Sequence, residues 1–298
     1  MTPDWIAVDW GTTALRVWAM AGPTPLEMRQ SDKGMARLAP SEFEPALLQI
    51  IGGWLDGRTL PVIACGMVGA RQGWSDAGYR RVPCAPLGPP LHAVATADPR
   101  LRLHIVPGLS QSAPPDVMRG EETQIAGYLA ANPGFEGVIC LPGTHAKWAR
   151  IANGQVQGFQ TCMTGELFAL LAGQSVLRHG LGDGWDDAAF RAAVAEALQA
   201  PHSLPAALFT LRAAGLLQDL PGAVARARLS GLLIGAELAA TRAFWHTTPV
   251  ALIGAGPLVA HYATALEMAG TVAEQTDGTD ITLAGLTAAR TLLKETAA

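Results

Sequence analysis

The chain has 298 residues, which accommodates roughly two domains of about 150 residues, each large enough to bury its own core. A formal net charge of −4, with no dense run of lysine and arginine, excludes the basic surface of a general nucleic-acid-binding protein. No apolar run approaches about 18 residues and the four cysteines are widely spaced, which predicts a reduced, cytoplasmic protein with no membrane span, zinc site or disulfide framework.

The first predicted element is a hairpin with a polar turn. Short alternating apolar runs at 5–8 and 16–20 predict two strands, and the turn between them offers backbone N–H groups, two hydroxyls and one carboxylate. The residues concerned are Asp9, Gly11, Thr12, Thr13 and Arg16. Phosphate oxygens accept hydrogen bonds from such donors, but a carboxylate repels them unless a hydrated divalent cation lies between. We therefore expect a phosphate-binding turn with Asp9 as a magnesium ligand, the alternative being an ordinary hairpin.

An α/β pattern continues through the first half. A helix is predicted at 41–55, and strands are predicted at 62–65 and 103–106. The segment 65–74 follows a strand and continues to Tyr79, Arg80 and Arg81, and it combines three glycines and an amide with cationic and aromatic residues. Such a loop suits a small polar ligand, and a glycine-rich surface loop is the alternative.

A linker is predicted at 110–115, where a Pro-Pro pair interrupts the pattern. It separates two expected domains, 1–112 and 113–298. After it, Asp116 is the expected cap of a helix at 117–131.

Two adjacent acids, Glu121 and Glu122, stand near the start of this predicted helix. Glu122 shares one helical face with Ile125 and Ala126, which places its carboxylate at the head of a buried stripe. We expect Glu122 to accept the proton of an acceptor hydroxyl and Glu121 to orient magnesium. The sequence leaves this division of roles open, and interaction of either acid with the helix dipole is the alternative.

A second hairpin is predicted from strands at 137–141 and 148–151, which flank a turn that contains Gly143, Thr144 and Lys147. This turn has no acid and again offers donors to phosphate. The remaining predicted elements are helices at 166–177, 186–198, 223–244, 258–268 and 282–293, and a buried strand at 250–253.

The late strand ends in Gly254-Ala255-Gly256 immediately before a helix, which suits either a nucleotide or a tight junction. A Rossmann motif is disfavoured because Val259 stands where the third glycine would be, and no Walker-type loop is present. Glu166 falls in the first turn of its predicted helix, where dipole stabilisation is the alternative to substrate binding.

Several segments carry motifs that are specific as a set: Asp9-Trp10-Gly11-Thr12-Thr13, Gly66-Met67-Val68-Gly69, Gly73-Trp74, Met118 to Gln124, Pro142 to Trp148, Met163 to Leu167, and Leu229 to Glu237. The first is similar to the first phosphate motif of the sugar kinase, actin and heat-shock ATPase superfamily. The whole set, which spans residues 6 to about 260, resembles the 2-dehydro-3-deoxygalactonokinase family.

The resemblance implies an α/β fold of two ribonuclease-H-like domains with a nucleotide cleft between them. It implies transfer of the γ-phosphoryl group of ATP, with Mg²⁺, to the 6-hydroxyl of 2-dehydro-3-deoxy-D-galactonate in galactonate breakdown. By motif, Asp9 would hold magnesium, and Gly254 and Gly256 would lie on the adenosine side. The other implied cofactor-binding residues are Gly11, Thr12, Thr13, Arg16, Gly143, Thr144 and Lys147. The expected substrate contacts are Gly34, Arg37, Met67, Arg71, Trp74, Arg119 and Glu166, of which an arginine would bind the substrate carboxylate through paired hydrogen bonds.

Three alternatives remain: a kinase for another sugar or sugar acid, a phosphohydrolase, and a non-catalytic nucleotide-binding protein on the same fold. A polyphosphate hydrolase would need a long cationic channel, and the chain has no cationic run. We expect no nucleic-acid or membrane partner, and an oligomer of identical chains is possible.

Overall fold

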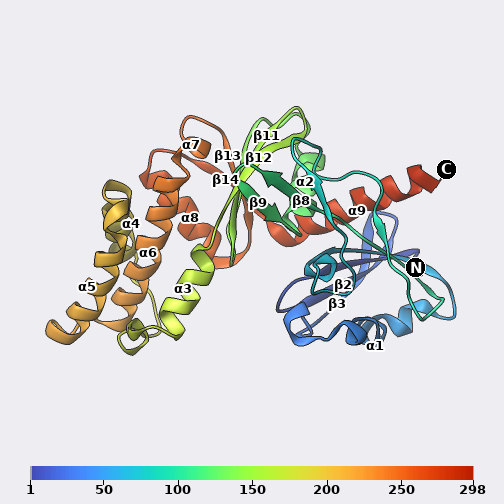
Figure 1. The fold of residues 1–298 in the computed structure, drawn as a ribbon, viewed down its shortest axis with the longest axis horizontal. Coiled ribbons are helices and arrows are strands. Elements are labelled where there is room, and N and C mark those ends of the chain that lie inside the picture. Colours follow the sequence, from blue (N-terminus) through green and yellow to red (C-terminus); the bar gives the residue numbers. More distant parts are fainter. Residues whose placement is uncertain (1, 298) are drawn as a thin grey trace. The chain divides into compact units, whose positions relative to one another are not determined.

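A computed structural model describes residues 2–297, drawn in Figure 1. The described residues form two compact units. Unit 1 comprises residues 2–135, 151–158 and 278–297, and unit 2 comprises residues 136–150 and 159–277. The expected domain division after residue 112 differs from this one, because residues 113–135 and the last helix pack within unit 1.

A six-stranded sheet forms the centre of unit 1, in the order β3-β2-β1-β4-β7-β6. Its strands are β1 (Trp5–Trp10), β2 (Leu15–Ala21), β3 (Thr24–Ser31), β4 (Leu60–Gly66), β6 (His92–Ala93) and β7 (Leu101–Ile105). β1 pairs antiparallel with β2 and parallel with β4, which pairs parallel with β7. The predicted strands at 5–8, 16–20, 62–65 and 103–106 are confirmed.

Helices cover both faces of this sheet. Helix α1 (Phe43–Leu55) packs on the face that carries Ile6 and Val8, and short 3₁₀ turns at Met35–Arg37 and Pro40–Glu42 precede it. The opposite face carries Trp5 and Ala7 and packs against α2 (Glu121–Ala131) and α9 (Gly278–Ala297). The two faces follow from the alternation of side chains along β1.

The predicted linker at 110–115 is wrong. A small sheet occupies this region, with β5 (Tyr79–Arg81) beside β8 (Gly108–Ser112) and β9 (Pro115–Met118). β8 and β9 form an antiparallel hairpin, so α2 begins at Glu121 rather than at 117. The Pro-Pro pair lies at the hairpin turn, and the parallel pairing of β8 with the distant β5 has no local sequence signal.

Unit 2 is built on a five-stranded sheet in the order β12-β11-β10-β13-β14. The strands are β10 (Gly137–Leu141), β11 (Ala146–Ala152), β12 (Gln155–Cys162), β13 (Val250–Gly254) and β14 (Ala273–Asp277). β13 pairs parallel with both β10 and β14. This strand order repeats that of β3-β2-β1-β4-β7, which confirms two ribonuclease-H-like sheets.

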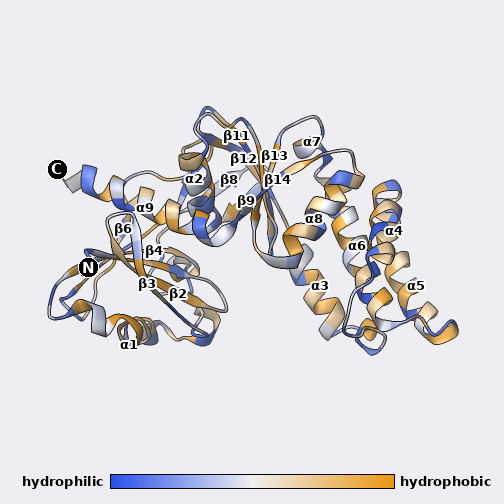
Figure 2. Ribbon diagram, turned by 180° about the vertical axis from the view of Figure 1, so that it is seen from behind, coloured by the Kyte–Doolittle hydropathy of each residue, from blue (hydrophilic) through white to orange (hydrophobic). Residues whose placement is uncertain are grey.

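The helices of unit 2 are α3 (Thr164–Gly173), α4 (Asp187–Gln199), α5 (Leu204–Leu217), α6 (Gly222–Ala240), α7 (Arg242–Trp245) and α8 (Gly256–Met268), with 3₁₀ turns at Val176–His179 and Pro201–Ser203. α4, α5 and α6 lie side by side (Figure 1). The sequence does not predict α5, because its own apolar residues occur on all sides of the helix and mark no single face, as the hydropathy colouring shows (Figure 2). No helix among residues 2–297 is long and apolar enough to cross a membrane.

The packing of α2 against α9 depends on two glycines. A Cβ added to Gly127 would lie 2.0 Å from the carbonyl oxygen of Ile281, and one added to Gly285 would lie 1.9 Å from that of Thr123. Both contacts involve backbone atoms, so neither can be relieved by a side-chain rotation. The two helix backbones therefore touch directly at this point.

We expect G127A and G285A each to lower the free energy of unfolding by about 1–3 kcal/mol or more, because overpacking displaces the helix backbones. The matched control is G53A in α1, where a Cβ would meet nothing within 4 Å and removal of backbone freedom should stabilise by about 0.5–1 kcal/mol. Urea denaturation of the three variants measures both effects. Wild-type stability of G127A and G285A would contradict the close approach of α2 and α9.

Candidate active site

Asp9 lies near the end of β1 and faces Arg16 of β2 in the register of the hairpin. The Arg16 guanidinium donates to Asp9 Oδ2 through Nη2 and through Nε, the latter at 3.1 Å, and Nη1 reaches Thr279 Oγ1 at 3.3 Å. Burial raises the pKa of Asp9, and the charge and hydrogen bonds of Arg16 oppose that rise. Arg16, which was predicted to bind the cofactor, is thus the counter-ion of Asp9 in this structure.

Gly34 packs directly against the backbone of the first phosphate-type turn. A Cβ there would lie 2.3 Å from the carbonyl carbon of Thr13, so no larger residue fits. The next two amides, of Met35 and Ala36, donate to the carbonyl oxygens of Gly11 and Thr12, each at 3.0 Å. Thr12 and Thr13 remain exposed, which leaves their hydroxyls available to a ligand.

The start of α2 holds the two acids in different surroundings. Glu122 is fully buried; its Oε2 accepts from the amide of Gly120 at 2.6 Å and its Oε1 from Thr123 Oγ1 at 2.9 Å. Burial and the charge of Glu121 raise the pKa of Glu122 to about 7. Glu121 is half-buried, and its Oε2 accepts from the amide of Arg119 at 2.9 Å. The expectation that Glu122 is the acid that faces a substrate therefore differs from the structure, which buries it beneath its own helix start.

Asp9 and α2 converge at the end of β4. A Cβ on Gly66 would lie 2.7 Å from the carbonyl oxygen of Trp10 and 3.5 Å from Asp9 Oδ1, and one on Gly120 would lie 3.3 Å from the Cα of Gly66. Gly66 and Gly120 have φ angles of 89° and 104°, which residues other than glycine rarely adopt. These two glycines therefore permit the close approach of β1, β4 and α2 that gathers the acids.

The candidate arginines differ sharply. Arg119 is only 9% exposed, and its guanidinium carbon lies 4.4 Å from the centroid of the Tyr79 ring. Its Nη2 donates a hydrogen bond to the carbonyl oxygen of Gly78 at 2.9 Å. Its Nε and Nη1 have no hydrogen-bond partner among residues 2–297. Arg37 and Arg71 are exposed. Arg37 forms an ion pair with Asp32, and Arg71 Nε lies 3.9 Å from Asp76 Oδ2. Arg119 is thus the candidate with unsatisfied donors.

Two other residues of the predicted substrate loop have different surroundings. Met67 is half-buried and begins the 3₁₀ turn Met67–Gly69 directly after β4. Trp74 packs against Trp10 and Phe43, with ring centroids 6.2 and 6.3 Å apart. Trp74 is therefore part of the aromatic packing that supports α1.

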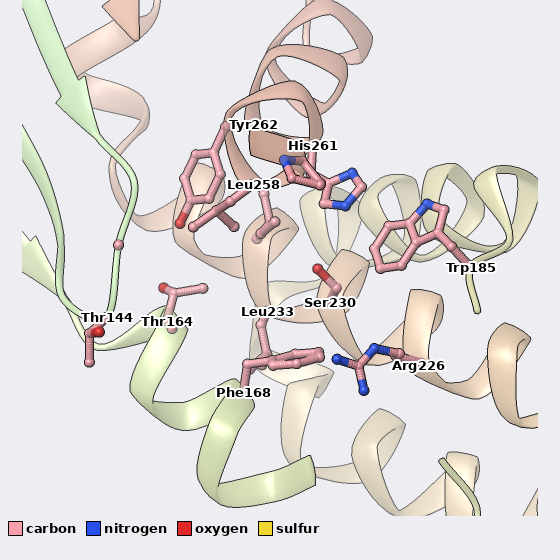
Figure 3. A pocket seen from close by; sticks show the side chains of 14 residues that line it. Thr144, Thr164, Phe168, Trp185, Arg226, Ser230, Leu233, Leu258, His261 and Tyr262 are labelled. Carbon is pink, nitrogen blue, oxygen red and sulfur yellow. The ribbon is translucent and has the colours of Figure 1, made fainter. Parts of the chain in front are cut away.

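Unit 2 contains a cavity of about 730 Å³ (Figure 3). One end is formed by Gly143 and Thr144 of the second phosphate-type turn, and α3, α6 and α8 supply the walls. The start of α3 presses against the turn, because a Cβ on Gly165 would lie 2.3 Å from the carbonyl oxygen of Gly143. The remaining lining residues are Thr164, Phe168, Trp185, Arg226, Ser230, Leu233, Ile234, Pro257, Leu258, His261 and Tyr262.

A buried carboxylate holds these walls together. Glu237 of α6 is 4% exposed, and its Oε1 accepts from Trp148 Nε1 at 2.7 Å. Its Oε2 accepts from Tyr262 OH at 2.7 Å and from Thr164 Oγ1. Burial raises the pKa of Glu237, and the three donors oppose the rise. Glu237 thereby joins β11, α3 and α8 to α6.

The other predicted residues of unit 2 are not among those that line the cavity. Lys147 is buried, and its Nζ donates to the carbonyl oxygen of His145 at 2.9 Å. Glu166 Oε2 lies 2.5 Å from His145 Nε2. Gly254 packs against Val259, whereas Gly256, with φ 68°, has open space beside its Cα. The residues immediately after Gly256, Pro257 and Leu258, line the cavity.

Sequence reasoning missed most of the cavity walls. The motifs at 163–167 and 229–237 marked two of the helices concerned, but they did not identify Phe168 or Arg226. Trp185 and His261, which stack on each other, lie 76 residues apart and have no local pattern that joins them.

Residues 2–297 contain no group of three or more histidine, cysteine, aspartate or glutamate side chains placed to hold a metal ion. Magnesium often binds through one or two carboxylates and keeps several water molecules, which differs from a cage of protein ligands. Asp9, whose side chain is 16% exposed and which belongs to the same hairpin as the exposed Thr12 and Thr13, fits that kind of site.

Comparison with known proteins gives full-length matches. The model of the family described as 2-keto-3-deoxy-galactonokinase matches residues 9–289. A probable 2-dehydro-3-deoxygalactonokinase from Rhizobium meliloti is 40% identical over 95% of each chain, and the 2-dehydro-3-deoxygalactonokinase of Escherichia coli is 38% identical over 91% of each. The crystal structure of a Sinorhizobium meliloti protein provisionally given the same name has a TM-score of 0.89 and 40% identity, covering 96% of this chain and 97% of that one.

The raised pKa of Glu122 predicts a pH-dependent stability. Between pH 4.5 and about 7 the folded state binds more protons at Glu122 than the unfolded state, so this residue makes folding less favourable as the pH rises through that window. E122Q imitates the neutral acid, so its stability relative to wild type should increase from pH 4.5 to pH 8, by at most about 3 kcal/mol. Urea denaturation at both pH values measures the difference. Parallel pH profiles would contradict the raised pKa.

Proposed function

The chain belongs to the 2-keto-3-deoxy-galactonokinase family, and on that premise we propose that it transfers the γ-phosphoryl group of ATP to the 6-hydroxyl of 2-dehydro-3-deoxy-D-galactonate. The observation that carries the proposal is the family match over residues 9–289, which includes both Gly-Thr turns and the cavity walls. The E. coli relative bears the name of this activity in full. An ATP-dependent kinase of galactonate breakdown also accounts for a cavity that begins at a phosphate-type turn.

Phosphoryl transfer depends chiefly on positioning and charge neutralisation. The exposed hydroxyls of Thr12 and Thr13 and the backbone of Gly143 and Thr144 would hold phosphate oxygens. Asp9 would hold Mg²⁺, which, when bound, neutralises negative charge on those oxygens. Arg16 would then keep the Asp9 side chain in place through its Nε and Nη2 donors.

A general base must lie within hydrogen-bond reach of the acceptor hydroxyl. Glu121 is half-buried, whereas Glu122 is fully buried with both oxygens hydrogen-bonded. We therefore assign the base to Glu121, and assign to Glu122 the closure of the helix start that positions Glu121.

The substrate carboxylate needs a cation with free donors. Arg119 fits best among the three candidates, since its Nε and Nη1 are buried and unpartnered within the described residues, and its guanidinium packs against the Tyr79 ring. A planar guanidinium binds a carboxylate through two parallel hydrogen bonds. Because Arg119 directly precedes Gly120 and the acids, a carboxylate bound there would bring the sugar acid close to Glu121.

The test is a phosphoryl-transfer assay with ATP, magnesium and a panel of aldonates and 2-dehydro-3-deoxyaldonates, with product identification by mass spectrometry and NMR. We expect ADP and the 6-phosphate of 2-dehydro-3-deoxy-D-galactonate. D9N should lower kcat about a hundredfold or more, because the magnesium ligand loses its charge. The control D56N changes the same group at an exposed αL position after α1 and should keep wild-type kcat. Phosphorylation of a different sugar class, or full activity of D9N, would refute the respective assignment.

The variants R119K, R37Q and R71Q test which of the three arginines binds the substrate carboxylate. Lysine keeps the charge at position 119 but not the two parallel donors, so R119K should raise the KM for the sugar acid about tenfold with little change in the KM for ATP. R37Q and R71Q should keep the KM within about twofold, since exposed ion pairs contribute little. Steady-state kinetics with each substrate varied in turn provides the comparison. A rise in sugar-acid KM for R37Q or R71Q alone would move the carboxylate site to that residue.

A further inference from the structure

The end of the unit 2 cavity opposite the Gly143–Thr144 turn carries a group of side chains with no role so far. In Figure 3, Thr144 lies at one end of the cavity, and Trp185 and Arg226 lie at the other. If the turn holds phosphates, a nucleoside extends toward this far end.

Two stacked pairs form the far walls. The guanidinium carbon of Arg226 lies 5.3 Å from the ring centroid of Phe168. The rings of Trp185 and His261 are 4.0 Å apart and nearly parallel, at 14°. Trp185 Nε1 donates to Asp187 Oδ1 at 2.9 Å, which fixes the orientation of the indole. The cavity therefore offers flat surfaces on two sides.

Arg226 has no hydrogen-bond or ion-pair partner among residues 2–297, although it lines a cavity. Arg228, two positions along the same helix, differs: its Nη2 lies 2.6 Å from Glu196 Oε2, and it does not line the cavity. An unpaired guanidinium beside aromatic rings in a concave site is suited to a flat, electron-rich ligand.

We propose that Arg226 is the specificity-determining residue for the nucleobase, which lies between the Phe168–Arg226 pair and the Trp185–His261 stack. This inference rests on the proposed function, because that function supplies the nucleotide. A guanidinium donates hydrogen bonds but accepts none. It can pair with both O6 and N7 of guanine but only with N7 of adenine. The site therefore accepts GTP as well as ATP, with Arg226 contributing more to GTP.

Binding is measured by calorimetry, with magnesium and without sugar acid, for the adenosine and guanosine imidotriphosphates and for inorganic tripolyphosphate. The variants are R226A and R226K, with R228A as matched control. We expect R226A to weaken binding of the adenosine nucleotide about tenfold or more, which corresponds to the loss of one hydrogen bond from a charged donor to N7. R226A should weaken binding of the guanosine nucleotide further and leave binding of tripolyphosphate unchanged. The affinities of R226K should lie between those of R226A and wild type, because lysine keeps the positive charge but lacks the planar guanidinium.

The outcomes separate the inference from the proposed function. Wild-type protein that binds neither imidotriphosphate would overturn the kinase assignment itself. Wild-type binding with R226A indistinguishable from R228A would overturn only the role of Arg226. If R226A lost the same affinity for all three ligands, Arg226 would contact the phosphates. If it lost less affinity for the guanosine than for the adenosine nucleotide, the pairing with O6 and N7 would be contradicted. Circular dichroism of each variant confirms that the fold is kept.

Discussion

The geometry of unit 2 depends on the buried carboxylate of Glu237. Burial of an acid is costly unless hydrogen bonds compensate for lost water, and here Trp148, Thr164 and Tyr262 supply them. Each donor comes from a different element, so one side chain of α6 fixes the relative positions of β11, α3 and α8. Because Thr164 begins α3, the same network also sets how closely that helix approaches the Gly143–Thr144 turn.

Unit 1 handles its acids in another way. Asp9 has a full positive charge beside it in Arg16, whereas Glu122 has only neutral donors and a neighbouring negative charge. The acids therefore differ in electrostatic state although they stand close to the same strand end. Burial raises the pKa of both acids, and only in Asp9 does a neighbouring positive charge oppose that rise.

Local sequence patterns were sufficient for much of the fold. Both Gly-Thr hairpins, α4 and α8 have strong short-range signals in alternation, turn residues or helical periodicity, and all four are present. The β8–β9 hairpin, α5 and β14 were missed, because their formation depends on pairing or packing with distant segments. In the site, Asp9 and Thr144 were visible as motif residues. The burial of Glu122, the Arg16 counter-ion and the Trp185–His261 stack depend on three-dimensional neighbours, which a single sequence does not display.

The return of the last helix to unit 1 has a consequence for synthesis of the protein. Leu286 and Ala289 of α9 pack in the same cluster as Trp5 and Ala7 of the first strand. A ribosome must translate all of unit 2 before α9 emerges, which takes on the order of ten seconds or more at about 5–20 residues per second. During that time one apolar face of the first sheet has no complete cover. The nascent chain therefore exposes part of that face until α9 has left the exit tunnel, and a chain truncated before α9 would keep it exposed.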